Sequence, residues 1–129
     1  MPEIRLPDRA EAVARAAEFV EAEAARAGWP VADVTRAVLA VSEAVGNAVE
    51  HGPVGGRIHV RFASAPEALT LEVTDGGDGP NPSLLDAAAL PADKLAEGGR
   101  GLYIMKTVAD EVRVAEGAVV LRFVRSGRA

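Results

Sequence analysis

One amphipathic helix constrains this chain more than any other stretch of its sequence. Six valines recur at steps of three and four and therefore share one face of a helix that begins near residue 31: Val31, Val34, Val38, Val41, Val45 and Val49. Glu43, Asn47 and His51 are each four apart and form a column on a neighbouring face. We expect the valine face to pack against the rest of the domain. The polar column is then the candidate for chemistry.

Length and composition indicate one domain, residues 1–129, with an aliphatic core, because aromatic side chains make up only 4% of the sequence. A net charge of −5 argues against nucleic acid as the main partner, since duplex binding depends on clustered Lys and Arg. The chain has no cysteine, which fits a reducing compartment. No apolar run approaches the roughly 18 residues that span a membrane, and the N-terminus lacks the apolar core of a signal peptide. We therefore expect a soluble, cytoplasmic protein with no membrane contact.

The segments around the helix predict a two-layer α+β sandwich, with about three main helices on one face of a mostly antiparallel sheet. Residues 3–6 alternate polar and apolar and predict an edge strand that stops at Pro7. Asp8 and Glu11 resemble a capping box that opens a helix to about Ala27, and Gly28 ends it. Two hairpins are predicted at residues 57–74 and 112–124, with a short helix right after Gly101.

Two glycine-rich segments follow the predicted strands. In Asp75-Gly76-Gly77-Asp78-Gly79, a carboxylate at a strand end can accept a hydrogen bond from a ligand amino group, and glycines let the backbone approach a flat ligand. An ordinary turn is the alternative, because short glycine motifs match often. In Gly98-Gly99-Arg100-Gly101, the start of a helix attracts anions and Arg100 suits phosphate; the alternative is a flexible linker. Residues 80–98 between them suggest a mobile flap.

The polar column itself carries two chemically useful groups. Asn47 offers an amide oxygen that suits Mg²⁺, an ion that normally arrives with substrate phosphates. Glu43, one turn earlier, can take a proton from an attacking hydroxyl. His51 stands at the helix C-terminus, where a cation is favoured, and we interpret it as a cap. For a lone Glu or Asn, a solvated helix face is the usual alternative.

These three segments, in this order, resemble the N, G1 and G2 boxes of the GHKL superfamily of ATP-binding domains. Ser42-Glu43-Ala44-Val45-Gly46-Asn47-Ala48-Val49-Glu50-His51 is similar to the N box, Asp75-Gly76-Gly77-Asp78-Gly79 to the G1 box, and Gly99-Arg100-Gly101-Leu102-Tyr103-Ile104-Met105 to the G2 box. Two features are typical of the small anti-sigma-factor serine kinases. They are the motif Glu-Ala-Val-x-Asn-Ala-x-x-His-Gly at residues 43–52, and Ala109-Asp110-Glu111-Val112 after the G2 helix.

The resemblance implies a Bergerat-type fold with an ATP lid and a Mg²⁺-dependent site for ATP or ADP. Glu43 would be the general base, Asn47 would hold Mg²⁺, and Asp75 would bind the adenine amino group. The remaining residues would shape the pocket and hold phosphates: Gly77, Gly79, Gly99, Arg100 and Gly101. The implied partners are an anti-anti-sigma factor as substrate and a sigma factor, with Arg15 on the first helix as a partner contact and a homodimer as the assembly.

Two positions depart from the family pattern. Ala118 follows Gly117 where the family often has Gly-Thr-Thr, which puts one nucleotide hydrogen bond in doubt. Gly46 stands where threonine is common, and a glycine inside a helix costs about 1 kcal/mol relative to alanine. Neither departure removes a catalytic group.

The leading hypothesis is therefore an anti-sigma factor that is also a serine kinase. The alternative is a non-catalytic nucleotide-binding switch or adaptor, which would not need Glu43 as a base. A histidine kinase's catalytic domain is disfavoured, because no dimerisation helix pair with a phospho-accepting histidine precedes the boxes. A generic α+β domain without a nucleotide would leave the ordered coincidence of three boxes unexplained.

Overall fold

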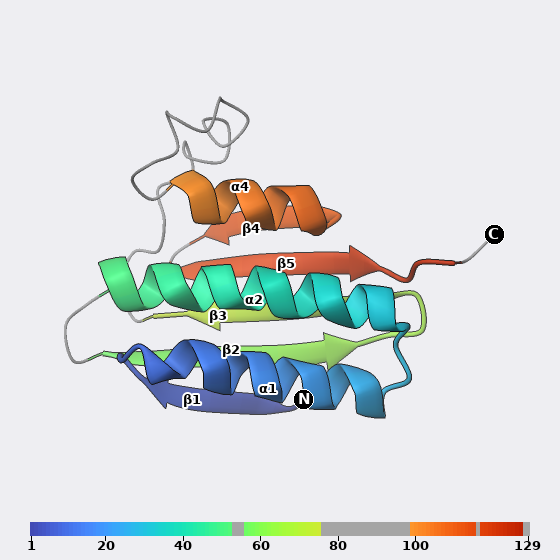
Figure 1. Cartoon of the computed structure of the whole chain (residues 1–129), viewed down its shortest axis with the longest axis horizontal. Coiled ribbons are helices and arrows are strands. Elements are labelled where there is room, and N and C mark those ends of the chain that lie inside the picture. The colour runs from blue at the N-terminus through green and yellow to red at the C-terminus, as the bar shows by residue number, and fades with distance from the viewer. Residues whose placement is uncertain (53–55, 76–98, 116, 128–129) are drawn as a thin grey trace.

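The computed structural model describes residues 1–52, 56–75, 99–115 and 117–127, and Figure 1 shows how their elements are arranged. These residues form three helices and five strands, as the sequence predicted. In chain order they are β1 (Glu3–Pro7), α1 (Glu11–Arg26), α2 (Val31–His51), β2 (Arg57–Ser64), β3 (Ala68–Thr74), α4 (Gly99–Val108), β4 (Glu111–Ala115) and β5 (Ala118–Val124). The predicted flap at residues 80–98 lies outside the described residues.

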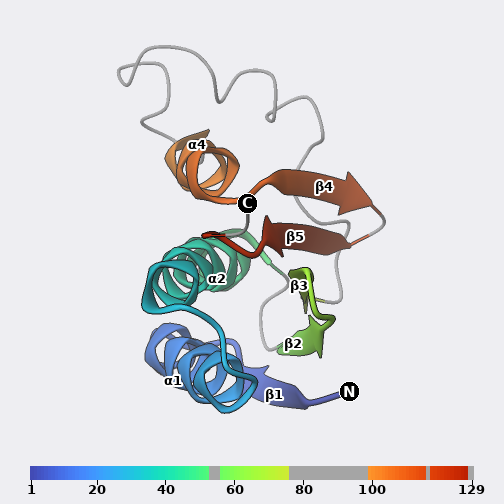
Figure 2. The same ribbon diagram turned by 90° about the vertical axis from the view of Figure 1, so that its right-hand side faces the viewer.

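The five strands form one sheet in the order β1-β2-β3-β5-β4, and every neighbouring pair is antiparallel. Both predicted hairpins are present, and β1 is an edge strand. All three helices lie on one face of the sheet, which Figure 2 shows end-on as two layers. The α+β sandwich is therefore confirmed.

Strict alternation along the strands sets which side of the sheet is buried. Each central strand turns every second side chain toward the helices, and these nine are buried: Ile58, Val60 and Phe62, Leu69, Leu71 and Val73, and Val119, Leu121 and Phe123. Burying each such side chain contributes on the order of 1.5–3 kcal/mol, so this layer dominates the stability. No described helix is both long and apolar enough to cross a membrane.

The turn between α1 and α2 is set by Gly28. Its φ of +80° is a conformation that glycine adopts without steric cost. The Gly28 and Trp29 N–H groups donate to the carbonyls of Ala25 and Ala24, which completes a Schellman cap. The predicted stop at Gly28 is therefore confirmed.

The capping box predicted at Asp8 and Glu11 is wrong. The cap residue is Ala10, whose φ of −53° and ψ of −35° are already helical, and no side chain caps the helix there. Instead, a backbone turn leads into α1, with the Ala12 N–H donating to the Arg9 carbonyl at 2.9 Å. Asp8 therefore lies too early in the chain to act as the cap.

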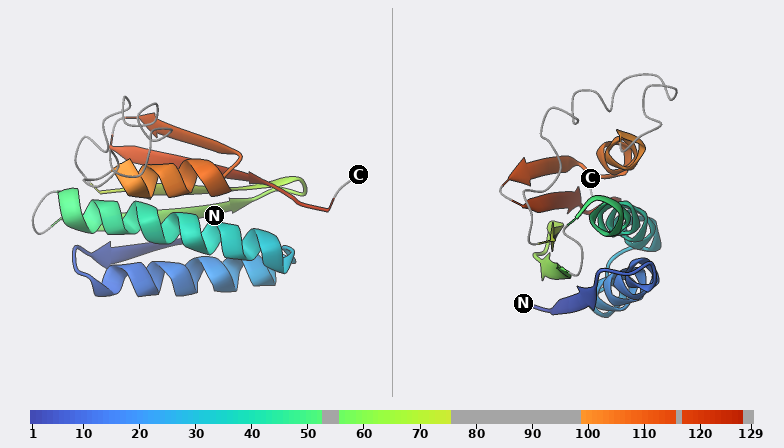
Figure 3. Two further views of the ribbon diagram at one scale, coloured as in Figure 1. Left: turned by 45° about the horizontal axis from the view of Figure 1, so that its top comes forward. Right: turned by 90° about the vertical axis from the view of Figure 1, so that its left-hand side faces the viewer.

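The valine face predicted for α2 is only partly correct. Val31 is 81% exposed, and Val34, Val38 and Val49 are half-buried at the edges of the contact. The buried face consists mainly of alanines: Asp33, Ala37, Ala40, Val41, Ala44, Val45 and Ala48. Small side chains let α2 lie close to the sheet while it packs between α1 and α4 (Figure 3).

A buried ion pair joins the N-terminal end of α2 to its neighbours. Asp33 is fully buried and accepts hydrogen bonds from the Arg36 guanidinium and the Ser126 N–H, both at 2.9 Å. Burial alone would raise the pKa of Asp33, but these hydrogen bonds and the Arg36 charge outweigh it and hold that pKa below its usual value.

Arg36 extends the same contact to the end of α4 and to β5. Its guanidinium donates to the carbonyls of Val108 and Val124, and it lies 3.3 Å from the Asp110 carboxylate. It also lies 5.7 Å from the centre of the Phe123 ring. One side chain thus ties together the start of α2, the end of α4 and the end of β5.

We expect Arg36→Ala to lower the free energy of unfolding by about 3–5 kcal/mol, because it leaves Asp33 buried without its counter-charge. Urea denaturation measures this change. The matched control is Arg26→Ala, which removes an exposed ion pair with Glu23 and should cost no more than about 1 kcal/mol. Equal costs for the two variants would show that the buried pair does not hold these elements together.

Candidate functional site

The ends of three secondary-structure elements meet at one end of the sandwich. They are the C-terminus of α2, the C-terminus of β3 and the N-terminus of α4. Figures 1 and 3 show the green end of α2 beside the first turn of α4. Asp75 follows directly after β3, whose last residue, Thr74, pairs with His59 and Ala118. The fold therefore brings together the N box, Asp75 of the G1 box and the G2 box, while Gly76, Gly77, Asp78 and Gly79 lie outside the described residues.

The first close contact joins Asn47 of α2 to Gly101 of α4. A Cβ atom added at Gly101 would lie 2.8 Å from Asn47 Nδ2 and 3.0 Å from Asn47 Oδ1, closer than side chains tolerate. The first turn of α4 therefore lies against the amide of Asn47, and any larger residue at position 101 would have to displace that amide. α4 begins at Gly99, three residues before the predicted start, so Gly99, Arg100 and Gly101 form a helical turn rather than a preceding loop.

The second close contact joins Gly52, directly after α2, to Asp75. A Cβ atom added at Gly52 would lie 3.1 Å from Asp75 Oδ2 and closer still to the Ala48 carbonyl oxygen. The carboxylate of Asp75, in the G1 box, therefore lies against the C-terminal end of α2, the helix that carries the N box. The sequence identified Gly52 as a helix stop and as the end of the His-Gly motif, but it did not predict the approach of Gly52 to Asp75.

The polar column of α2 is present, with unequal exposure. Glu43 and Asn47 are half-buried, and Glu43 lies one turn before Asn47, the residue that contacts Gly101 of α4. The His51 side chain is 56% exposed, with its Nε2 atom 3.8 Å from a Glu50 oxygen. His51 therefore lies on the protein surface, at the C-terminal end of α2.

The other predicted residues have separate positions. Arg15 is exposed on α1, and α2 lies between α1 and α4, so Arg15 is separated from the first turn of α4. Gly77 and Gly79 lie outside the described residues. Gly117 has a φ of +82° and makes the turn between β4 and β5.

The donor set fits Mg²⁺ only together with a nucleotide. Within the described ranges, no group of three or more His, Cys, Asp or Glu side chains could hold a metal ion. Asn47 offers a single amide oxygen at the foot of α4. Mg²⁺ in such sites usually takes one or two protein ligands and completes its shell with phosphate oxygens and water.

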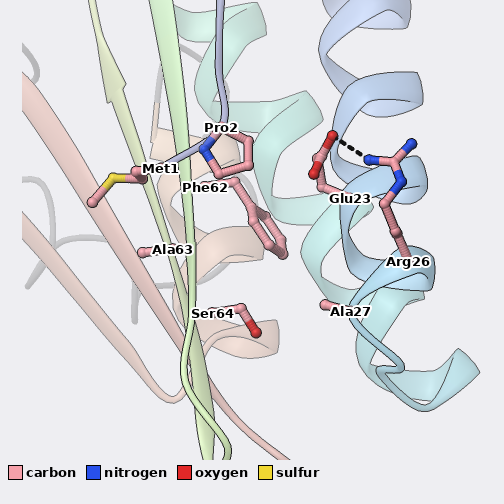
Figure 4. A pocket seen from close by; sticks show the side chains of 8 residues that line it. All are labelled: Met1, Pro2, Glu23, Arg26, Ala27, Phe62, Ala63 and Ser64. Carbon is pink, nitrogen blue, oxygen red and sulfur yellow. Dashed lines mark hydrogen bonds and ion pairs between the residues drawn. The ribbon is translucent and has the colours of Figure 1, made fainter.

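A surface pocket of about 440 Å³ lies elsewhere on the molecule. Figure 4 shows it between the end of α1 and the end of β2. Its lining residues are Met1, Pro2, Glu23, Arg26, Ala27, Phe62, Ala63 and Ser64. Ser64 pairs with Leu69 at the opposite end of the β2–β3 hairpin from Asp75, so this pocket is separate from the convergent ends.

Comparison with known proteins gives a consistent family. The profile described as the histidine kinase-like ATPase domain matches residues 6–125. A serine-protein kinase RsbW from Bacillus velezensis is 33% identical over 127 residues, which cover 92% of this chain and 79% of the relative. The RsbW proteins of Bacillus subtilis and Staphylococcus aureus are also 33% identical, and the matches cover 87% of this chain and 76% and 77% of those relatives.

A solved structure shares the fold. The crystal structure of the RsbU and RsbW domains of Rv1364c from Mycobacterium tuberculosis matches with a TM-score of 0.62 at 20% identity. The match covers 97% of this chain and 32% of that one, so the described fold corresponds to one part of a longer protein.

Substitution of two glycines of this region by alanine should change the free energy of unfolding in opposite directions. We expect Gly101→Ala to lower the free energy of unfolding by about 1–3 kcal/mol, because the new methyl group overlaps the Asn47 amide. We expect Gly46→Ala to raise it by about 0.4–1 kcal/mol, because its Cβ meets no described atom within 4 Å. Urea denaturation of both variants measures these changes. Equal effects would contradict the close approach of α4 to Asn47.

Proposed function

The chain belongs to the family of histidine kinase-like ATPase domains, and on that premise we propose that it is an anti-sigma factor with Mg²⁺-ATP-dependent serine kinase activity. Its substrate is a serine of an anti-anti-sigma partner, and its second partner is a sigma factor. The resemblance to the GHKL superfamily that the sequence motifs indicated is confirmed by the profile match over residues 6–125.

One observation supports the proposal: two glycines leave room for Asn47 of the N box to approach the G2-box helix and for Asp75 of the G1 box to approach the end of α2. Gly101 lets the G2-like turn rest on Asn47, and Gly52 lets Asp75 lie against the end of α2. The 33% identity to serine-protein kinases RsbW over 92% of the chain favours the kinase over an unrelated nucleotide-binding domain.

The proposed binding roles follow from this arrangement. Asp75 accepts a hydrogen bond from the adenine amino group, and Asn47 offers its amide oxygen to Mg²⁺. The N–H groups in the first turn of α4 have no partners within the helix, so they point their donors toward bound phosphates. The remaining pocket residues are Gly77, Gly79, Gly99, Arg100 and Gly101.

The proposed reaction is in-line transfer of the γ-phosphoryl group of ATP to a serine hydroxyl. Glu43 lies one turn before Asn47 on α2 and takes the proton that the hydroxyl loses. Bound Mg²⁺ supplies charge neutralisation on the phosphates. Arg100 and the N–H donors of α4 stabilise the charge that remains, which is the main contribution a protein makes to such a transfer.

The partner surfaces are proposals of the same kind. Arg15 lies exposed on α1, on the helical layer, where a protein partner can reach it. A homodimer is the proposed assembly. The net charge of −5 makes nucleic acid an unsuitable direct partner.

We expect calorimetry to detect ATP and ADP binding that depends on Mg²⁺. Asn47→Ala should abolish the Mg²⁺-dependent part, because it removes the only amide oxygen that α2 offers at the foot of α4. Arg26→Ala, at the far end of α1, is the matched control and should bind as the wild type does. Unchanged binding by Asn47→Ala would remove this residue from the site.

We expect Glu43→Ala to keep nucleotide binding and to lose phosphoryl transfer by about 10²–10⁴-fold, the usual contribution of a general base. Mass spectrometry of a purified anti-anti-sigma protein incubated with Mg²⁺-ATP measures the transfer. Nucleotide binding without transfer by the wild type would instead favour the non-catalytic switch. Full activity of Glu43→Ala would exclude Glu43 as the base.

A further inference from the structure

We propose that Gly52 is a positioning residue that fixes the Asp75 carboxylate and thereby sets the selectivity of the site for a 6-amino purine. This inference rests on the proposed function, because it assumes that Asp75 accepts a hydrogen bond from adenine. It assigns a role to Gly52, which ends the His-Gly motif and for which the sequence predicted no role in the site.

The backbone at Gly52 shows that space, and not conformation, requires glycine. Its φ of −76° and ψ of 174° are extended values that any residue can adopt. Its N–H donates to the Ala48 carbonyl at 2.8 Å, which closes the end of α2. A side chain at this position would therefore suit the backbone and would fail only because of its neighbours.

Those neighbours leave no room on either side. A Cβ atom at Gly52 would overlap the Ala48 carbonyl oxygen and would lie 3.1 Å from Asp75 Oδ2. The carbonyl belongs to the last turn of α2, and Ala48 is buried against the core. A methyl group would therefore force the backbone at Gly52 or Ala48 to shift, and the Asp75 carboxylate would have to give by a few tenths of an ångström.

The displaced carboxylate has little freedom to recover its place. Thr74, the residue before it, is held in the sheet between His59 and Ala118. A hydrogen bond weakens steeply once its distance and angle leave a narrow range, so a small displacement is enough to lose the adenine contact. The first turn of α4, where the proposed phosphate donors lie, contacts Asn47 and not Gly52, so we expect the phosphate contacts to change less than the adenine contact.

The experiment compares two nucleotides that differ only at the contact in question: ATP and purine riboside triphosphate, which lacks the 6-amino group. Calorimetry with Mg²⁺ gives the ratio of their dissociation constants. The wild type should prefer ATP by about 10- to 100-fold, the usual value of a hydrogen bond to a charged group. Gly52→Ala should bring this ratio close to one by weakening ATP while leaving the analogue almost unchanged.

A control variant separates the loss of preference for ATP from a general loss of nucleotide binding. Gly46→Ala makes the same chemical change where the Cβ meets no described atom, and it should keep the wild-type ratio. If Gly52→Ala weakened both nucleotides equally, or kept the preference for ATP, the positioning role would be wrong. If the wild type bound neither nucleotide, the proposed function would fail instead.

A second variant keeps the test valid if Gly52→Ala does not fold. Asp75→Glu lengthens the side chain on the other side of the same contact, so the carboxylate should no longer fit beside Gly52. This variant should also lose the preference for ATP. Circular dichroism and thermal unfolding establish that each variant is folded. A preference for ATP that survives in Asp75→Glu would show that the carboxylate position is not fixed by Gly52.

Discussion

The buried pair between Asp33 and Arg36 is the interaction on which the arrangement of the helices depends. A carboxylate out of water is stable only when its charge and hydrogen bonds are satisfied, and the half-buried Arg36 guanidinium and the Ser126 N–H do this for Asp33. Arg36 reaches the last carbonyl of α4 and a carbonyl at the end of β5, while Asp33 accepts the Ser126 N–H. The pair therefore sets where α4 ends relative to α2.

Because α4 is a rigid helix of ten residues, fixing its last turn also fixes its first turn. That first turn rests on Asn47, at the far end of α2 from Arg36. α4 is thus held at both ends, by Arg36 at its last turn and by the contact with Asn47 at its first. The site itself is defined as much by absent side chains as by present ones, since Gly101 and Gly52 create the space that Asn47 and Asp75 occupy.

The sequence predicted most of the fold because its signals are local. Alternation along β2, β3 and β5, and the positive φ that Gly28 adopts, depend only on neighbouring residues and on one buried face. The sequence-based predictions were wrong where tertiary packing decided which residues are buried and where a helix begins. Val31 matches the valine spacing but is exposed, since alanines make the close contact. Asp8 matches a capping box, but a backbone turn through Ala10 starts the helix two residues later.

The sequence by itself determined the family, the order of the boxes and the chemistry available to the site: a carboxylate at Glu43, an amide at Asn47 and a strand-end carboxylate at Asp75. These depend on residue type and spacing, which the chain displays directly. Only the tertiary structure decided which of these groups touch. The contact of Asn47 with Gly101, and of Asp75 with Gly52, joins residues more than 20 positions apart, and no local pattern measures the space between them. The buried Asp33 belongs to the same class, because a polar residue in a first turn shows its partners only after the chain has folded.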